Sequence, residues 1–329
     1  MRRRDLLVLT GGAIIVAHAA VAQTANRRIA FIHPTLPIEL ISETNPSWQI
    51  FFAELRRLGD VEGQNLTVDR YSAEGHPERY AEVARLAVSH NPDLIVTFPD
   101  TLASEALKAT QTIPIVAIMG DPLRTGLVTS LARPNVNLTG TTVNAGIELY
   151  GKRLQILKEA VPSVSRVGYL SLSAGWEGQS GKYLREASSR LGISLIPLFV
   201  DQITPAALDR VLAALPEEHL DGVYVTDSPE LGRQLSLIVA SIEKARLPAS
   251  YPYRFWVEKG GLMSYGPDIA GVLRRIAQDV HLILNGAKPG DIPIYQPAKF
   301  ELIINLQTAK AIGLTMPASL LAQADEVIE

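Results

Sequence analysis

From Arg28 onward, short runs of β-branched residues alternate with longer helical stretches along the chain. This alternation predicts an α/β fold, because parallel strands need crossover connections and helices usually supply them. The first strand is expected over 28–33, and the first helix from Pro46, with Asn45 as its cap, to Gly59. Apolar residues recur along that helix at three- and four-residue spacing: Trp48, Phe51, Phe52, Leu55 and Leu58. We expect this stripe to face a core.

The alternation occurs in two sets, which a turn-rich passage over 120–144 separates. In the first set, strands are also expected over 66–71, 94–98 and 113–119, and helices over 78–89 and 102–110. In the second set, strands are expected over 166–171, 194–200, 222–226, 249–253, 262–265 and 300–305, and helices over 147–160, 182–191, 205–215, 230–244 and 269–284. Because 329 residues are too many for one ordinary core, we expect two doubly wound, Rossmann-like lobes with a cleft between them.

The amino terminus has the pattern of a secretory signal peptide, expected over residues 1–22. Arg2-Arg3-Arg4 precedes an apolar run over 6–16, and the small residues Ala20 and Ala22 suit cleavage after Ala22. The arginine pair leaves both the general and the twin-arginine export routes open. No later segment approaches the ~20 apolar residues of a membrane span, so the mature protein is expected in the periplasm.

Composition excludes several classes of partner and of site. A net charge of -3 and a pI near 6.1 provide no basic field for nucleic acid. The chain has no cysteine, which excludes disulfides, thiolate metal ligands, a cysteine nucleophile and a cysteine-linked lipid anchor. The histidines form no i,i+4 pair and no carboxylate-rich calcium loop is present, so neither a metal nor a cofactor is expected.

Signatures of catalysis fail at the positions where an α/β fold would carry them. Residues 33–37 follow the first strand without the glycines of a dinucleotide fingerprint. Residues 175–182 resemble a phosphate loop, but Trp176 stands at the first required glycine and Tyr183 replaces the magnesium-binding hydroxyl. Residues 178–181 are one residue too short for the nucleophile elbow of a serine hydrolase. We therefore predict a binding protein rather than an enzyme.

Several separated motifs resemble those of one known family. They are Gly120-Asp121-Pro122 with Gly126-Leu127-Val128, the stretches 130–134 and 137–140, the segment 260–268, and the segments 300–306 and 324–329. Nearly end to end, the mature chain resembles the ABC transporter substrate-binding protein family, in the tryptophan- or tyrosine-binding branch of the type I periplasmic binding proteins. One departure is Asn135-Val136, where family members often carry Gly-Gly. Because Val136 tolerates positive φ poorly, that turn is expected to differ locally.

The resemblance implies a type I fold, with two lobes joined by a three-stranded hinge. It places 27–142 plus 266–288 in the N-terminal lobe and 143–265 plus 289–329 in the C-terminal lobe. The hinge candidates are Gly140, Thr141, Tyr265, Gly266 and the segment 290–297. The family also implies a monomer that captures a small molecule, an aromatic amino acid or a related organic acid, and delivers it to ABC permease subunits in the inner membrane. An exported sensor that docks on a receptor kinase or chemoreceptor is the alternative.

Candidate ligand residues follow from the strand ends, where ligands bind in open α/β sheets and helix N-termini donate N–H groups to anions. In the first lobe these are Thr35, Pro99, Asp100, Thr101 and Asp121. Thr101 is the residue we most expect to donate hydrogen bonds to a ligand carboxylate. The alternative is that Asp100 or Thr101 caps its own helix. Thr141 in the hinge is a further ligand candidate. His33 also ends a strand, and we expect it to be structural or exposed more often than a ligand contact.

In the second lobe the candidates are Ser173, Trp176, Asp227, Ser228 and Tyr253. Trp176, in a loop flanked by glycine, is expected to stack on a flat ligand, with packing on the lobe surface as the alternative. Asp227 is expected to accept from a ligand amine or to cap the following helix. Core or hinge packing is the expected role of Tyr253, as of Tyr251 and Trp256, and an aromatic wall of the site is the alternative. A ligand that contacts both lobes would favour a closed state.

Overall fold

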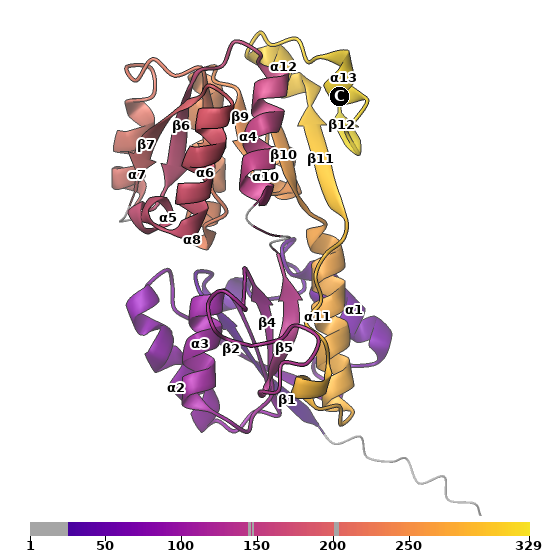
Figure 1. Cartoon of the computed structure of the whole chain (residues 1–329). Coiled ribbons are helices and arrows are strands. Elements are labelled where there is room, and N and C mark those ends of the chain that lie inside the picture. Colours follow the sequence, from indigo (N-terminus) through magenta and orange to yellow (C-terminus); the bar gives the residue numbers. More distant parts are fainter. Residues whose placement is uncertain (1–25, 144–145, 147, 201–203) are drawn as a thin grey trace, which may run out of the picture.

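The computed structural model describes residues 26–143, 146, 148–200 and 204–329, and the expected signal peptide lies outside them. The chain forms two bodies, joined along one side of the molecule (Figure 1). We call the lower body in the view the N-lobe, built on a five-stranded sheet, and the upper body the C-lobe, built on a seven-stranded sheet. The two sheets confirm the predicted α/β fold with two lobes. In the described part of the chain, no helix is both long and apolar enough to cross a membrane.

The N-lobe sheet is parallel throughout, in the order β2-β1-β3-β4-β5. Its strands are β1 (Arg27–His33), β2 (Leu66–Ser72), β3 (Leu94–Thr97), β4 (Ile115–Met119) and β5 (Leu138–Thr142). One face packs against α1 (Gln49–Leu58) and α11 (Ile269–Leu284), and the other against α2 (Tyr80–Ser89) and α3 (Asp100–Ala109). The short helices η1 (Ile38–Leu40), η2 (Pro77–Arg79) and η3 (Pro289–Asp291) lie in its loops. Because both faces are covered, the strands are apolar almost continuously.

The C-lobe sheet has the order β12-β11-β10-β9-β8-β6-β7, with only β11 antiparallel to its neighbour β10. Its strands are β6 (Arg166–Ser171), β7 (Ser194–Phe199), β8 (Gly222–Val225), β9 (Ala249–Tyr251), β10 (Met263–Pro267), β11 (Phe300–Asn305) and β12 (Glu326–Ile328). One face packs against α4 (Glu148–Ala160), α6 (Gln179–Arg190), α12 (Leu306–Ala311) and α13 (Ala318–Leu321). The other packs against α7 (Pro205–Ala213), α8 (Pro229–Arg233), α9 (Leu235–Lys244) and α10 (Arg254–Glu258).

The chain passes between the lobes after β5, after β10 and before β11. The last passage lies further along than the expected boundary at 289. Ile292 and Ile294 still belong to the N-lobe core. Tyr295 donates its N–H to the Gly140 carbonyl and accepts from the Thr142 N–H, both at 2.8 Å, which adds this segment beside β5. The segment 289–295 therefore extends the N-lobe, and the return to the C-lobe follows Tyr295.

Several local expectations need correction. The turn-rich passage contains β5, and the expected helix 230–244 is two helices, α8 and α9, that meet at Gln234. The first helix begins at Gln49 rather than Pro46, because Asn45 instead closes a turn by accepting from the Ser47 N–H at 2.9 Å. Short α10 follows β9 where the sequence indicated only a strand and crossover. These differences are a strand inside a turn-rich passage, a break within a helix, a later helix start and a short extra helix, none of which periodicity alone marks.

Two hinge glycines are needed for close approach of the backbone. At Gly140 in β5, φ is +137° and a Cβ would lie 2.0 Å from the carbonyl oxygen of Ala117 in β4. At Gly266 in β10, a Cβ would lie 2.1 Å from the Pro252 carbonyl oxygen. In the turn before β5, Asn135 takes the positive φ of 57° and Val136 does not. The departure from Gly-Gly is thus accommodated by the residue that tolerates it.

Candidate functional site

The carboxyl ends of the strands in the two sheets face one another where the lobes meet. Glu74 follows β2 in the N-lobe, and Arg233 ends α8, which follows β8 in the C-lobe. Arg233 Nη1 donates to the Glu74 carbonyl oxygen at 2.8 Å, so the lobes touch here. Gly75 leaves room for this contact, because its φ is +84° and a Cβ would lie 2.2 Å from Arg233 Nη1. Glu74 and Arg233 therefore mark a point where loops that follow strands of the two sheets meet.

Aromatic side chains dominate the N-lobe edge of this junction. His33 ends β1, Phe98 follows β3 and Trp48 precedes α1. The His33 ring centroid lies 4.7 Å from that of Phe98 and 5.7 Å from that of Trp48, and Trp48 and Phe98 are 5.4 Å apart. Trp48 is buried in the core, as its helical stripe predicted, and its Nε1 has no hydrogen-bond partner. Phe98 is only partly buried, so this edge presents an aromatic surface.

His33 is a neutral, structural imidazole. Its Nδ1 accepts from the backbone N–H of Thr35 at 3.0 Å and of Leu36 at 2.8 Å, which leaves the proton on Nε2. Burial, with a smaller contribution from Arg233, lowers the pKa of His33 to about 3. The ring therefore adds no positive charge at neutral pH. Thr35 is buried, and its N–H is already used in this turn.

The start of α3 is where the sequence led us to expect Thr101 to donate to a ligand carboxylate. Pro99 is the N-cap residue and no side chain caps the first turn, so backbone N–H groups there are left for another acceptor. Asp100 does not cap its own helix: its carboxylate accepts from the Gly120 N–H at 2.5 Å and from Thr125 Oγ1 at 3.3 Å. Asp100 therefore ties the loop after β4 to α3, while Thr101 is exposed beside the open turn.

Asp121, another candidate, is used within its own loop. It accepts from the Arg124 N–H at 3.0 Å and lies 3.8 Å from the Arg124 guanidinium, and both side chains are largely exposed. By contrast, four hydroxyls on the strands near the junction are buried without hydrogen-bond partners: Thr97, Thr141, Thr142 and Ser264. Buried hydroxyls are normally paired. Thr141 and Ser264 lie on two of the strands that lead out of a lobe, so hydroxyl groups without hydrogen-bond partners lie in the hinge strands.

The C-lobe edge is built around a buried guanidinium. Arg153, in α4, has a side chain only 1% exposed. Its Nε donates to the Tyr265 carbonyl at 2.6 Å and its Nη2 to the Pro252 carbonyl at 3.2 Å. Its Nη1 has no hydrogen-bond partner and lies 3.7 Å from Asp227 Oδ2. One side chain thus joins α4, the segment after β9, the hinge strand β10 and the residue that follows β8.

Tyrosines surround this ion pair. The Arg153 guanidinium carbon lies 5.9 Å from the ring centroids of both Tyr150 and Tyr253, within reach of cation–π attraction. Burial raises the pKa values of Tyr224 and Tyr253 well above the ordinary tyrosine value, so both hydroxyls stay protonated. Asp227 keeps 19% of its side chain exposed. The C-lobe edge therefore presents the Asp227 carboxylate, backed by a buried cation and aromatic rings.

Asp227 does not cap the helix that follows it, which was the alternative role expected for this residue. Ser228 is the N-cap of α8: it accepts from the Leu231 N–H at 3.4 Å and hydrogen-bonds Glu230 Oε2 at 2.5 Å. Asp227 is therefore not needed as a cap. Ser173 is the first residue of α5 (Ser173–Glu177), on the same edge of the sheet after β6.

Trp176 lies in helix α5 and not in a loop, which corrects the sequence prediction. The Arg185 guanidinium covers its ring at 4.5 Å, and its centroid lies 5.5 Å from Tyr169 and 5.8 Å from Phe199. The ring is partly buried against the C-lobe core, which is the packing alternative. Loop composition misled the prediction, because Gly175 and Gly178 here allow close helix contacts. Tyr251 and Trp256 stack on each other at 5.4 Å inside the core.

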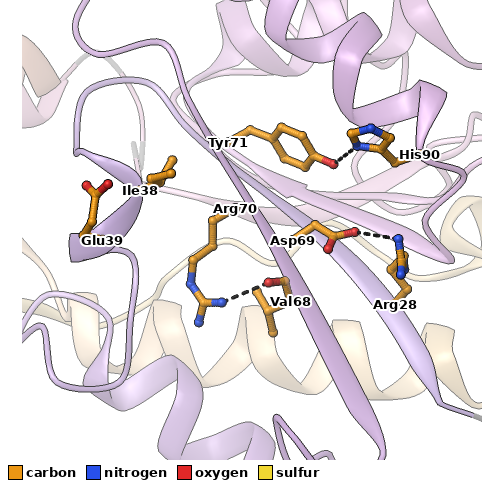
Figure 2. A pocket seen from close by; sticks show the side chains of 8 residues that line it. All are labelled: Arg28, Ile38, Glu39, Val68, Asp69, Arg70, Tyr71 and His90. Atoms are coloured by element: carbon orange, nitrogen blue, oxygen red, sulfur yellow. Dashed lines mark hydrogen bonds and ion pairs between the residues drawn. The ribbon is translucent and has the colours of Figure 1, made fainter.

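Two surface hollows lie away from the facing edges. One is lined by residues of the outer strand β2 and its surroundings (Figure 2). Its polar groups are paired with one another: Asp69 with Arg28 at 3.3 Å, and the Tyr71 hydroxyl with His90 Nδ1 at 2.6 Å. The other is lined by Asn135, Asn137 and Lys288 among others, at the amino end of β5. Neither lies where ligands bind in open α/β sheets.

Sequence reasoning missed Arg153 and Phe98. Arg153 had a detectable signal, because it stands on the apolar stripe of its helix beside Tyr150, Leu154 and Leu157, all of which are buried. Phe98 could be found only as the last apolar residue of an expected strand. Within the described ranges, no group of three or more His, Cys, Asp or Glu side chains is placed to hold a metal ion.

Comparisons with known proteins agree with this architecture. The family model described as ABC transporter substrate binding protein matches residues 51–328. A tyrosine-binding protein of Clostridioides difficile (strain R20291) is 23% identical over 266 residues, which cover 80% of this chain and 75% of that protein.

Two solved structures are similar over 92% of this chain. A conserved domain protein from Vibrio cholerae matches with 25% identity, a TM-score of 0.80 and 99% of its own length covered. An ABC domain in complex with L-Trp from Streptococcus pneumoniae matches with 21% identity, a TM-score of 0.78 and 100% of its length covered. These matches confirm the resemblance, the type I fold and a binding role rather than an enzymatic one. The chain belongs to the ABC transporter substrate-binding protein family.

Proposed function

We propose that this protein binds an aromatic amino acid, or a related small organic acid, between its lobes and delivers it to an ABC permease. The observation that carries the proposal is the accessible carboxylate of Asp227, backed by Arg153 and tyrosines, opposite an aromatic edge of the N-lobe. The names of two relatives, which mention tyrosine and L-Trp, support the same class of ligand.

Each part of such a ligand has a complementary partner at the junction. The ammonium group would donate to Asp227, the only one of the second-lobe candidates that carries a charge. The carboxylate would accept from the uncapped first turn of α3 and from Thr101. The ring would pack against Phe98, which is the partly exposed member of the N-lobe aromatic group. Tyr253, Thr141 and Ser173 would line the remaining sides.

Closure would follow from the placement of these partners in different lobes. A ligand that contacts both lobes binds the closed form more tightly than the open form, so it shifts the population toward closure. Gly140, Thr141, Tyr265 and Gly266 lie in β5 and β10, the strands before two of the passages between lobes. The closed form is the one we expect the permease to recognise.

The cellular setting is part of the proposal. The pattern over residues 1–22 supports export by a cleavable signal peptide, and a monomer in the periplasm would present the closed lobes to permease subunits in the inner membrane. The sensor alternative differs in the partner only. Deletion of the gene in the source bacterium should abolish high-affinity uptake of the labelled ligand, whereas a sensor would leave uptake intact and lose a ligand response.

Ligand binding is tested with mature protein that has been unfolded, stripped of ligand and refolded. Thermal shift and calorimetry would compare L-tryptophan and L-tyrosine with L-leucine, sugars and purines. A ligand at 100 times its Kd should add about 2.7 kcal/mol to the unfolding free energy. Asp227→Asn should lose most of the affinity, while Asp69→Asn, at the hollow of Figure 2, should retain it. Silence of folded wild-type protein toward both aromatic amino acids would refute an aromatic amino acid as the ligand and leave only the related organic acids.

A further inference from the structure

The Arg153–Asp227 pair has an unusual order of exposure. The cation is the hidden member, with 1% of its side chain exposed, and the carboxylate is the accessible one, with 19% exposed. In the N-lobe, the pair Arg275–Asp279 has the reverse order, with 31% and 0% exposed. Only the C-lobe pair therefore offers a carboxylate to the junction while it keeps a fixed positive charge directly behind that carboxylate.

Two of its three nitrogens fix the Arg153 charge in place. Nε and Nη2 are held by the Tyr265 and Pro252 carbonyls, and the rings of Tyr150 and Tyr253 flank the guanidinium. Nη1 is the nitrogen left without a hydrogen bond, 3.7 Å from Asp227 Oδ2. Because a guanidinium does not lose its proton in proteins, the positive charge is permanent.

We infer that Arg153 is a specificity-determining residue, whose buried charge makes the site accept zwitterions and reject simple amines. The inference rests on the proposed function, since it assigns the ligand ammonium to Asp227. A ligand with an ammonium alone gains from Asp227 but is repelled by Arg153 a few ångströms behind it. A ligand with a carboxylate next to its ammonium has the same ammonium interactions, but Arg153 also attracts its carboxylate, which offsets the repulsion that Arg153 exerts on the ammonium. A ligand with a carboxylate alone is repelled by Asp227, the nearer charge.

A role of Arg153 in specificity can be distinguished from a structural role, because its charge and its hydrogen-bonding geometry can be changed independently. Arg153→Lys keeps the charge and loses the fork that reaches two carbonyls. Arg153→Met keeps most of the stem and loses the charge. If Arg153 only supports the fold, each substitution should change the affinities for all ligands by the same factor.

The test measures Kd by calorimetry for three probes that share one ring: L-tryptophan, tryptamine and indole-3-propionate. In wild-type protein, tryptophan should bind more tightly than either analogue. The ratio of the tryptamine Kd to the tryptophan Kd should be the same in Arg153→Lys as in the wild type. In Arg153→Met this ratio should fall about tenfold. A ratio in Arg153→Met within twofold of the wild-type ratio overturns the inference and leaves the proposed function standing.

If Arg153→Met fails to fold, Asp227→Asn provides a second test of the Arg153 charge. With the carboxylate neutralised, Asp227 no longer repels indole-3-propionate and the Arg153 charge is unopposed, so this ligand should bind about tenfold more tightly than it binds the wild type, and the gain should be smaller in the double variant Asp227→Asn/Arg153→Gln. Structural damage would not produce a gain in affinity. No gain, with tryptophan binding weakened, overturns the inference alone. Absence of tryptophan and tyrosine binding in the wild type overturns the aromatic amino acid as the proposed ligand, and the inference with it.

Discussion

The two lobes present unlike edges to the same junction. The N-lobe edge contains an aromatic group that carries no charge, because His33 is held as a neutral ring against Phe98 and Trp48. The C-lobe edge is charged, because Asp227 is accessible and Arg153 is buried behind it. The first edge is suited to recognise a flat ring and the second to recognise charge, so a ligand with both features is the one that would draw the lobes together.

The largest expected effect is on stability and comes from removing the buried cation of the C-lobe edge. Arg153→Met should lower the free energy of unfolding by about 3–5 kcal/mol, because it leaves the Tyr265 and Pro252 carbonyls and Asp227 without their partner. Urea unfolding followed by circular dichroism measures this loss. Arg185→Met is the matched control: Arg185 donates to a single carbonyl, that of Trp176, and its loss should cost about 1 kcal/mol. Equal losses would contradict the special role of Arg153.

Because the His33 ring is held neutral, the stability of the protein should depend on pH. The pKa of His33 is 6.5 unfolded and about 3 folded, so between these values the unfolded state binds the extra proton. Stability should therefore fall as pH drops below 6.5, by up to about 1.4 kcal/mol per pH unit from this group. His33→Asn keeps an acceptor for the Thr35 N–H and should remove this part of the acid slope.

Urea midpoints at pH 7, 6 and 5 for both proteins would measure the slope. His76→Asn, a change at an exposed histidine, is the control for general effects of the substitution. Parallel curves for wild type and His33→Asn would show that His33 is not held neutral by the fold.

The aromatic edge should act without regard to ligand charge. Phe98→Leu removes the partly exposed ring and should weaken L-tryptophan and indole-3-propionate by the same factor, about three- to tenfold. Asp227→Asn should change the two affinities in opposite directions. Calorimetry with both ligands on both variants checks the division of roles, and a Phe98→Leu effect confined to tryptophan would contradict it.

The smallest expected effect concerns the direct contact between the edges. Gly75→Ala places a methyl group where Arg233 Nη1 reaches the Glu74 carbonyl, so it should weaken the closed form and reduce ligand affinity about two- to tenfold. Gly63→Ala is the matched control, since its φ of +81° is similar but no atom lies within 4 Å of the added Cβ.

Both glycine variants should lose about 1–2 kcal/mol of stability from backbone strain. Only Gly75→Ala should lose affinity. Equal affinities in the two variants would show that the Arg233 contact contributes nothing to closure.

The order of strands and helices was predictable because it depends on local periodicity. The expected strands 166–171 and 300–305 and the helix 269–284 match β6, β11 and α11 at both ends. Misses occurred where two local signals compete. Trp176 has glycines on both sides, yet Arg185 and Tyr169 bring it into a packed helix, and those contacts come from other segments.

The sequence by itself determined an α/β chain in two sets, its strand ends and therefore Asp227 and Thr101 as site candidates. Periodicity of 2 and 3.6 residues and turn composition are local properties, so they can be read without a structure. Tertiary structure alone decided that Ser228 rather than Asp227 caps α8, that Asp100 ties down a loop, and that Arg153 lies behind Asp227. Arg153 and Asp227 are far apart in the sequence, and only the packing of α4 against the C-lobe sheet brings their charges together.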